Sequence, residues 1–156
     1  MNDQTTNILF VCTGNICRSP FAEGLFTKLA LQKGYKGLFA ESAGLMALPG
    51  NAATALAQQV AAEHGVDLSN HRAKSATEER VGRADLILVM EKNHEVTLSS
   101  FFPKATNKAR LIRHFARFGS KTRGIADPYG LNYDAYRFCF LDIEDAVTGL
   151  IQFLSD

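Results

Sequence analysis

The amino-acid sequence predicts an α/β fold in which four parallel strands form one doubly wound sheet flanked by helices. Short apolar runs alternate along the chain with longer stretches whose apolar residues recur every three or four positions. Residues 84–90 are nearly all apolar, which is typical of a parallel strand buried on both faces. A glycine-containing loop directly follows the first apolar run, and such folds bind ligands at the carboxyl ends of their strands.

The first three elements are predicted to be a strand, a helix and a second strand. Residues 7–12 form the first apolar run. Ser19-Pro20 is typical of a helix start, because serine can cap a helix and proline at the first helical position loses no needed N–H group. The apolar spacing then predicts a helix over 19–33, closed by Gly34, and a strand over 37–43.

The middle of the chain is predicted to hold further helices and strands in alternation. Asn51 is expected to cap an alanine-rich helix over 51–64 that Gly65 stops. The pattern Ser75-x-x-Glu78 is typical of a capping box before a short helix. The remaining elements are a strand over 84–90, a helix over 91–101 that ends before Pro103, and a fourth strand over 109–113.

Residues 132–154 carry the longest helical pattern, with apolar residues at three- and four-residue steps. This spacing predicts one amphipathic helix of about five or six turns whose apolar side packs on the core. The apolar positions are Tyr136, Phe140, Ile143, Val147, Leu150, Ile151 and Leu154. Because no linker or repeat divides the chain, we expect a single domain over 1–156 with its core at about 7–154.

Composition limits the class of protein. The chain has 156 residues, of which 46% are apolar and 21% charged, and its net charge of +1 gives no reason to expect nucleic acid as a partner. The polar start, 1–7, and the short first apolar run do not resemble a signal peptide, so we expect a cytoplasmic protein without membrane insertion. Three cysteines do not suit a disulfide framework or a metal site, and neither metal nor cofactor is expected.

Cys12 and Arg18 bracket the loop after the first strand. The loop's amides are expected to converge at the positive end of a helix dipole, where an anion of phosphate size binds well. The same dipoles and a nearby cation favour the thiolate form of a cysteine, so Cys12 is predicted to be a nucleophile. Arg18 can hold two phosphoryl oxygens at once. Gly14 allows close backbone approach, and Asn15 tolerates a left-handed conformation.

The whole segment from Cys12 to Pro20 resembles the signature loop of the low-molecular-weight protein tyrosine phosphatases. The resemblance extends over nearly the whole chain and implies the strand order 2-1-3-4. It also implies a phosphate-binding loop made of Thr13, Gly14, Asn15, Ile16, Cys17, Arg18 and Ser19. Further matching segments are 41–44, 68–73, 84–91 and 127–129.

Within that family the chain is most similar to a bacterial branch that is paired with tyrosine autokinases of capsule and exopolysaccharide export. The similarity lies in the segment from Glu41 to Leu48. It implies that the substrate is a phosphotyrosine protein, such as a tyrosine autokinase, and that the process is polysaccharide export. Inorganic phosphate is then expected as product and inhibitor.

Asp127 is the candidate general acid, because a tyrosine leaving group departs more readily when it is protonated. An Asp-Pro pair by itself usually signals only a turn. The resemblance places the Asp-Pro-aromatic loop beside the phosphate site, and it therefore implies that Asp127 protonates the leaving group and later activates water. Pro128 stiffens this turn, and Tyr129 is expected to form one wall of the substrate slot.

A supporting shell of hydrogen bonds is also implied by the resemblance. Asn15, Ser42 and His71 are expected to hold the loop in shape, and the Ser19 hydroxyl can donate to the Cys12 sulfur. The other histidines, His64, His94 and His114, lack a comparable sequence context and are interpreted as ordinary surface or helix-end residues.

Cys17 lies five positions after Cys12 in the same loop. Oxidised Cys12 could be captured by Cys17 as a disulfide, which would prevent irreversible oxidation. The alternative is that Cys17 is only a small loop residue, and the sequence does not decide between the two. Cys139 falls within the last helix and is expected to be inert.

The slot is expected to select phosphotyrosine through apolar walls supplied by Ile16, Tyr129 and Leu45 or Leu48. Related phosphoarginine phosphatases tend to carry threonine at the position of Ile16, so protein arginine phosphatase is the alternative. Arsenate reductase is disfavoured, because only Cys139 lies beyond the loop. A nucleotide-binding P-loop lacks its lysine, and a non-catalytic phosphotyrosine-binding module would need neither a nucleophile nor Asp127.

Overall fold

A computed structural model describes residues 4–155 and shows one four-stranded parallel sheet. The strands are β1 (Thr6–Cys12), β2 (Leu38–Gly44), β3 (Leu86–Val89) and β4 (Ala109–Leu111). They are ordered β2-β1-β3-β4, so the first strand lies inside the sheet and pairs with both β2 and β3. The fold class is as the sequence predicts, and the strand order is the one that the family resemblance implies.

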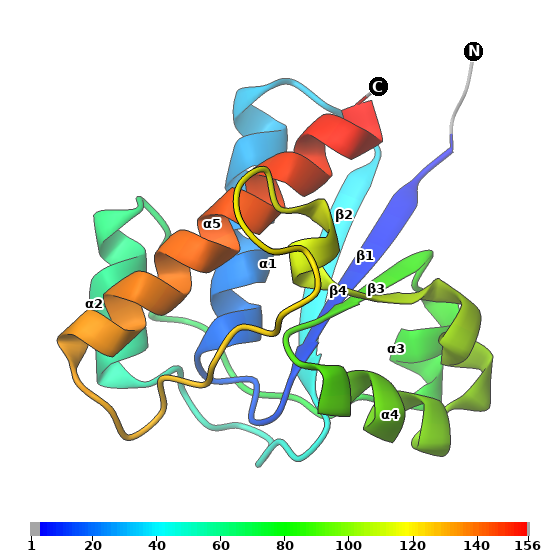
Figure 1. The fold of residues 1–156 in the computed structure, drawn as a ribbon, viewed down its shortest axis with the longest axis horizontal. Helices are drawn as coiled ribbons and strands as arrows, with labels where there is room; N and C mark the ends of the chain where they lie inside the picture. Colours follow the sequence, from blue (N-terminus) through cyan, green and yellow to red (C-terminus); the bar gives the residue numbers. More distant parts are fainter. Residues whose placement is uncertain (1–3, 156) are drawn as a thin grey trace.

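Helices cover both faces of this sheet (Figure 1). On one face lie α1 (Arg18–Gln32), α2 (Ala55–Glu63) and α5 (Tyr133–Ser155), and on the other lie α3 (Glu78–Arg83) and α4 (Lys92–Phe101). Two short 3-10 helices, η1 (Pro103–Lys108) and η2 (Ile112–Phe115), flank β4. This arrangement places the start of α1 at the carboxyl end of β1.

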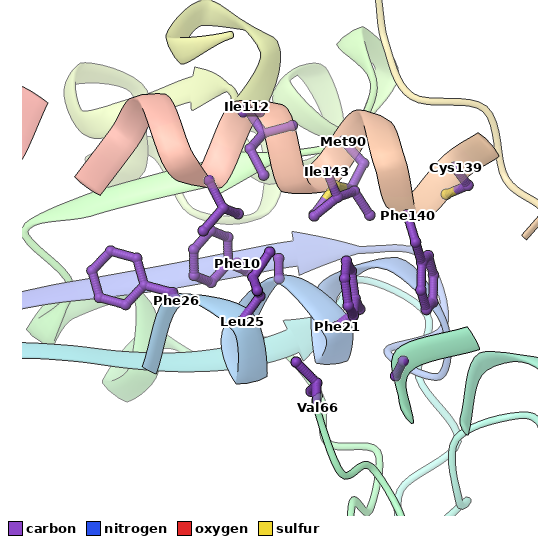
Figure 2. Packing of buried hydrophobic residues seen from close by; sticks show 14 of the residues in the cluster. Phe10, Phe21, Leu25, Phe26, Val66, Met90, Ile112, Cys139, Phe140 and Ile143 are labelled. Carbon is purple, nitrogen blue, oxygen red and sulfur yellow. The ribbon is translucent and has the colours of Figure 1, made fainter. Parts of the chain in front are cut away.

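The core is divided by the sheet into two parts, because successive side chains of a strand point to opposite faces. Ile8 and Phe10 of β1 pack with α1 and α5, whereas Leu9 and Val11 pack with the α3 and α4 side. In the larger part, seen in Figure 2, the rings of Phe21 and Phe140 stack with centroids 4.1 Å apart. This contact joins the first turns of α1 to α5, directly behind the loop that follows β1.

Three predicted helix caps, Asn51, Ser75 and Ser19, are wrong. The second helix begins at Ala55 and is capped by Thr54, whose hydroxyl accepts from the Ala57 amide, because Asn51 instead pairs through its carbonyl with Ala73. The short third helix is capped by Thr77.

Ser75 does not form the predicted capping box with Glu78, because its backbone extends the sheet in a bridge to Gly44. The fourth strand ends at Leu111 instead of residue 113, since the chain turns there into η2. Helix α1 starts one residue early, at Arg18, and the Ser19 side chain does not cap it.

None of the helices within residues 4–155 combines the length and the apolar character needed to cross a membrane.

Candidate active site

A pocket of about 260 Å³ opens at the carboxyl end of β1. Cys12, which ends the strand and is 2% exposed, lines this pocket together with Thr13, Gly14 and Arg18 of the following loop. The sequence-predicted nucleophile and anion-binding arginine therefore lie in the same cavity. Outside the loop, the walls come from Met46, Leu48, Asn51, Asp127 and Tyr129.

The Cys12 sulfur lies 2.9 Å from the hydroxyl oxygen of Ser19, in the first turn of α1. Both groups are buried. Ser19 also accepts a hydrogen bond of 2.9 Å from the Asn15 side-chain amide. With that acceptor position filled by Asn15, the hydroxyl proton of Ser19 is free to point at sulfur, which stabilises a thiolate.

Asn15 gives the loop its shape. It has a φ of 57°, the left-handed conformation that the sequence predicts for this position. Its buried amide donates to the hydroxyls of Ser19 and Ser42, each at 2.9 Å, and its side-chain oxygen accepts from the Lys74 amide at 2.9 Å. Since all these partners are fixed in α1, β2 and the chain after β2, the loop is joined to three parts of the fold.

Two further groups complete this side of the loop. Ser42 donates to the Glu23 carboxylate at 2.6 Å, and His71 Nε2 lies 2.7 Å from the backbone carbonyl oxygen of Asn15. The structure therefore brings together Asn15, Ser19, Ser42 and His71, the shell residues named from sequence. Glu23 joins them without having been predicted.

Arg18 is 1% exposed, and its guanidinium is held by two short hydrogen bonds. Nη1 donates to the Glu91 carboxylate and to the Ile125 carbonyl, both at 2.7 Å. Burial lowers the pKa of Arg18, but the Cys12 sulfur and the Glu91 carboxylate raise it by more, so that the net shift is upward. A permanently charged, oriented guanidinium thus borders the pocket.

Asp127 lies across the pocket from the loop, in the segment between η2 and α5. One carboxylate oxygen is 3.6 Å from Nη2 of Arg18, and the other accepts from the Tyr129 amide at 3.1 Å. The side chain is 44% exposed, which leaves it accessible to a bound molecule. The candidate acid and Arg18 are therefore close together, as their proposed roles require.

The sequence prediction for the slot walls named Ile16, Tyr129 and Leu45 or Leu48. Ile16, Leu48 and Tyr129 line the pocket, whereas Leu45 packs against the part of the core beside α3 and α4. Met46, the next residue, lines the pocket in its place. The chain leaves β2 at Gly44, and the side chains beyond that strand end no longer follow a predictable alternation.

Cys17 also borders the pocket, but its sulfur is engaged on the other side. It lies 3.3 Å from the Tyr136 hydroxyl of α5 and 3.7 Å from the Thr54 hydroxyl. Burial raises the pKa of the Cys17 thiol. Cys139 is buried in α5, where burial raises its pKa strongly, in agreement with the expectation of an inert thiol.

His94 contacts the loop, although sequence reasoning interpreted it as an ordinary surface or helix-end residue. It is 3% exposed, and its Nε2 lies 2.9 Å from the hydroxyl oxygen of Thr13 in the loop. Its Nδ1 accepts a hydrogen bond of 3.1 Å from the Glu91 amide. Burial, followed by the positive charge of Arg18, lowers the pKa of His94 to about 4.

The signal for His94 was present as the pattern Glu91-x-x-His94 directly after the most apolar strand. Two polar residues three apart at a helix start resemble a reciprocal cap, and this start lies at the ligand-binding edge of the sheet. Within the described part of the chain, His64 and His114 make no contact with the loop like that of His94. His64 ends α2 and pairs with Glu144 at 2.8 Å, and His114 is exposed.

Comparison with known proteins agrees with this geometry. The family model for low molecular weight phosphotyrosine protein phosphatase matches residues 7–156. The chain is 37% identical over 140 residues to the low molecular weight protein-tyrosine-phosphatase Etp of Escherichia coli K12, which covers 90% of this chain and 88% of that protein.

Solved structures show the same similarity. A low molecular weight protein tyrosine phosphatase from T. tengcongensis has a TM-score of 0.87 and 37% identity, covering 96% of this chain and 99% of that one. The YwlE arginine phosphatase from Geobacillus stearothermophilus has a TM-score of 0.86 and 34% identity, covering 96% and 93%.

Proposed function

Since the chain belongs to the low molecular weight phosphotyrosine protein phosphatase family, we propose that it hydrolyses phosphotyrosine in proteins through a cysteinyl-phosphate intermediate. One observation carries the proposal: Cys12, Arg18 and Asp127 line one pocket, with Arg18 3.6 Å from Asp127. A nucleophile, an anion-binding cation and a proton donor are the groups that hydrolysis of an aryl phosphate needs.

In the first step, the Cys12 thiolate attacks phosphorus, so that an S–P bond forms while the bond to the aryl oxygen breaks. Asp127 donates its proton to the departing phenolate oxygen. Arg18 binds the equatorial phosphoryl oxygens and stabilises their charge in the transition state. The short bonds that the guanidinium donates to the Glu91 carboxylate and the Ile125 carbonyl hold it in place for this role.

In the second step, Asp127 removes a proton from water, and the resulting hydroxide attacks phosphorus. The S–P bond breaks, inorganic phosphate is released and the thiolate is restored. The Ser19 hydroxyl, 2.9 Å from sulfur, stabilises the thiolate as it leaves. The same contact orients the Cys12 sulfur before the first step.

Phosphotyrosine is the substrate that the pocket walls favour. Ile16, Leu48 and Tyr129 present apolar surface along the pocket that Cys12 also lines, where the phosphoryl group would bind. A flat aromatic ring fills such a slot by hydrophobic contact. The substrate protein is then a tyrosine autokinase of capsule or exopolysaccharide export in the cytoplasm, with inorganic phosphate as product and inhibitor. Support for this partner comes from the resemblance of the segment from Glu41 to Leu48.

Substitution of the three chemical groups tests the mechanism. Cys12→Ser should abolish turnover of p-nitrophenyl phosphate while the pocket still binds phosphate, and Arg18→Ala should lose both. Asp127→Ala should reduce turnover of phenyl phosphate by about 10²–10⁴-fold. The loss should be smaller for p-nitrophenyl phosphate, whose leaving group needs no proton. Equal losses for the two esters would exclude Asp127 as the acid.

Phosphoarginine hydrolysis is a second candidate, because the YwlE arginine phosphatase has a very similar fold. Ile16 disfavours it, since an aliphatic side chain offers no hydrogen bond to a guanidinium group. Turnover of a phosphotyrosine peptide and a phosphoarginine peptide should be compared in the wild type and in Ile16→Thr. A wild type that prefers the phosphoarginine peptide would reverse the assignment.

We also propose Cys17 as a resolving thiol. Peroxide would oxidise the Cys12 thiolate to sulfenic acid, and attack by the Cys17 sulfur would expel water and form a disulfide. The Cys17 sulfur must first leave the hydroxyls of Tyr136 and Thr54. After peroxide treatment and reduction, Cys17→Ser should recover less activity than the wild type. Equal recovery would contradict a protective role.

A further inference from the structure

We propose that His94 is a positioning residue that fixes the Thr13 end of the phosphate-binding loop, acting as a neutral imidazole with its proton on Nε2. The proposal rests on the proposed function, because Thr13 matters only if the pocket holds a phosphoryl group. His94 itself does not line the pocket and acts through Thr13.

The hydrogen-bond partners of His94 decide where its proton lies. Nδ1 accepts from the backbone amide of Glu91 at 3.1 Å, and an amide can only donate. In a neutral ring the proton must then be on Nε2, which lies 2.9 Å from the Thr13 hydroxyl oxygen and donates to it. An imidazolium would direct a second donor at the Glu91 amide and break this arrangement.

The charged groups around the ring also favour the neutral form. Arg18 approaches from α1, and its positive charge disfavours a second cation, while burial acts in the same direction. Glu91 at the start of α4 and Asp127 from the opposite segment favour protonation but do not outweigh these effects. The pKa of about 4 keeps His94 neutral at neutral pH.

Thr13 is held on two sides by the rest of the fold. Its carbonyl oxygen accepts from the Met46 amide at 2.9 Å, and its hydroxyl is bonded to His94. Gly44 packs so closely that an added Cβ would lie 2.7 Å from the Thr13 carbonyl oxygen. Gly44 and Met46, at and after the end of β2, therefore hold the Thr13 backbone, and His94 holds its side chain.

The contact between His94 and Thr13 also connects Thr13 to Arg18 through Glu91. Glu91 binds Arg18 at 2.7 Å through its carboxylate and binds His94 through its amide. Thr13 and Arg18 both line the pocket. One continuous chain of contacts thus positions the start of the phosphate-binding loop relative to the guanidinium that would hold the phosphate.

A matched pair of variants separates this role from simple capping of α4. His94→Gln places an amide donor near the position of Nε2 but loses the acceptor for Glu91. His94→Asn keeps an acceptor near the position of Nδ1 but cannot reach Thr13. We expect His94→Asn to raise the inhibition constant of inorganic phosphate by about three- to tenfold, and His94→Gln to raise it less. The opposite order would overturn the proposal in favour of a capping role.

Coupling to Thr13 gives a second readout. If His94 acts through the Thr13 hydroxyl, the double variant His94→Asn, Thr13→Val should bind phosphate no more weakly than the weaker of the single variants. If the fold-losses of phosphate affinity in the two single variants multiply in the double variant, the two residues act independently and the proposal is overturned. Circular dichroism melting of each variant controls for unfolding.

Nitrogen-15 NMR of the His94 ring tests the proton position without any substrate. We expect the Nε2–H neutral tautomer from pH 8 down to pH 5. An imidazolium at pH 6, or a proton on Nδ1, would overturn the proposal. A protein with this tautomer but without phosphatase activity would instead disprove the proposed function, so the two failures are distinguishable.

Discussion

The two sides of the phosphate-binding loop are held by different kinds of contact. On the Asn15 side, amides and hydroxyls of Asn15, Ser19 and Ser42 form short bonds to one another. On the Thr13 side, a buried imidazole connects the loop to the ion pair of Arg18 and Glu91. The first side fixes the backbone path of the loop, and the second fixes its position relative to the phosphate-binding cation.

Asn15→Ala should have the largest effect on the Asn15 side of the loop. It removes three hydrogen bonds made by a fully buried side chain and places alanine at a φ of 57°. We expect a loss of about 2–5 kcal/mol in the free energy of unfolding, measured by urea denaturation, with loss of turnover.

Asn15→Gly is the matched control, because glycine adopts positive φ without cost. It should be more stable than Asn15→Ala by about 1 kcal/mol, while still lacking the side-chain bonds. Equal stability of the two variants would show that the left-handed backbone contributes nothing.

Acid should weaken the Thr13 side. The pKa of His94 is lowered from 6.5 to about 4, so the unfolded chain binds a proton between these values that the folded protein does not bind. Stability therefore falls as the pH decreases through this range, by up to about 3 kcal/mol. Urea denaturation of the wild type and of His94→Gln between pH 7 and pH 4 measures this fall in the free energy of unfolding. Identical pH slopes for the two proteins would contradict a neutral buried His94.

Ser42→Ala should have the smallest effect. It removes the hydroxyl between Asn15 and the Glu23 carboxylate, but Asn15 keeps its bonds to Ser19 and to the Lys74 amide. We expect about 1 kcal/mol of destabilisation and a modest rise in KM for p-nitrophenyl phosphate. A loss as large as that of Asn15→Ala would mean that Ser42, and not Asn15, organises this side.

The Asn15 side could be predicted from the sequence, whereas the Thr13 side could not. Asn15 and Ser19 lie in one continuous segment, whereas Ser42 and His71 lie 27 and 56 positions from Asn15 and were expected only from the family resemblance. His94 and Thr13 are 81 positions apart, and only the parallel pairing of β1 with β3 brings them together. Burial of the imidazole follows from tertiary packing that the residues around His94 do not reveal.

The difference between local and long-range contacts also explains why two of the predicted helix caps were wrong and why Leu45 does not line the pocket. Strand and helix types follow from apolar spacing, which is local. Asn51 and Ser75 do not cap α2 and α3 because their backbones pair with distant residues: the Asn51 carbonyl accepts from the Ala73 amide, and Ser75 forms a bridge to Gly44. Leu45 and Met46 differ by one position, and the turn after Gly44 decides which of them faces the pocket.

The contact between Cys17 and Tyr136 has a consequence for biosynthesis. These residues are 119 positions apart, and the stack of Phe21 on Phe140 joins the same two helices. During translation the loop that holds Cys17 emerges from the ribosome long before α5, the helix whose Tyr136 contacts it. A nascent chain therefore carries the Cys17 thiol without its hydroxyl partner on Tyr136 until α5 docks.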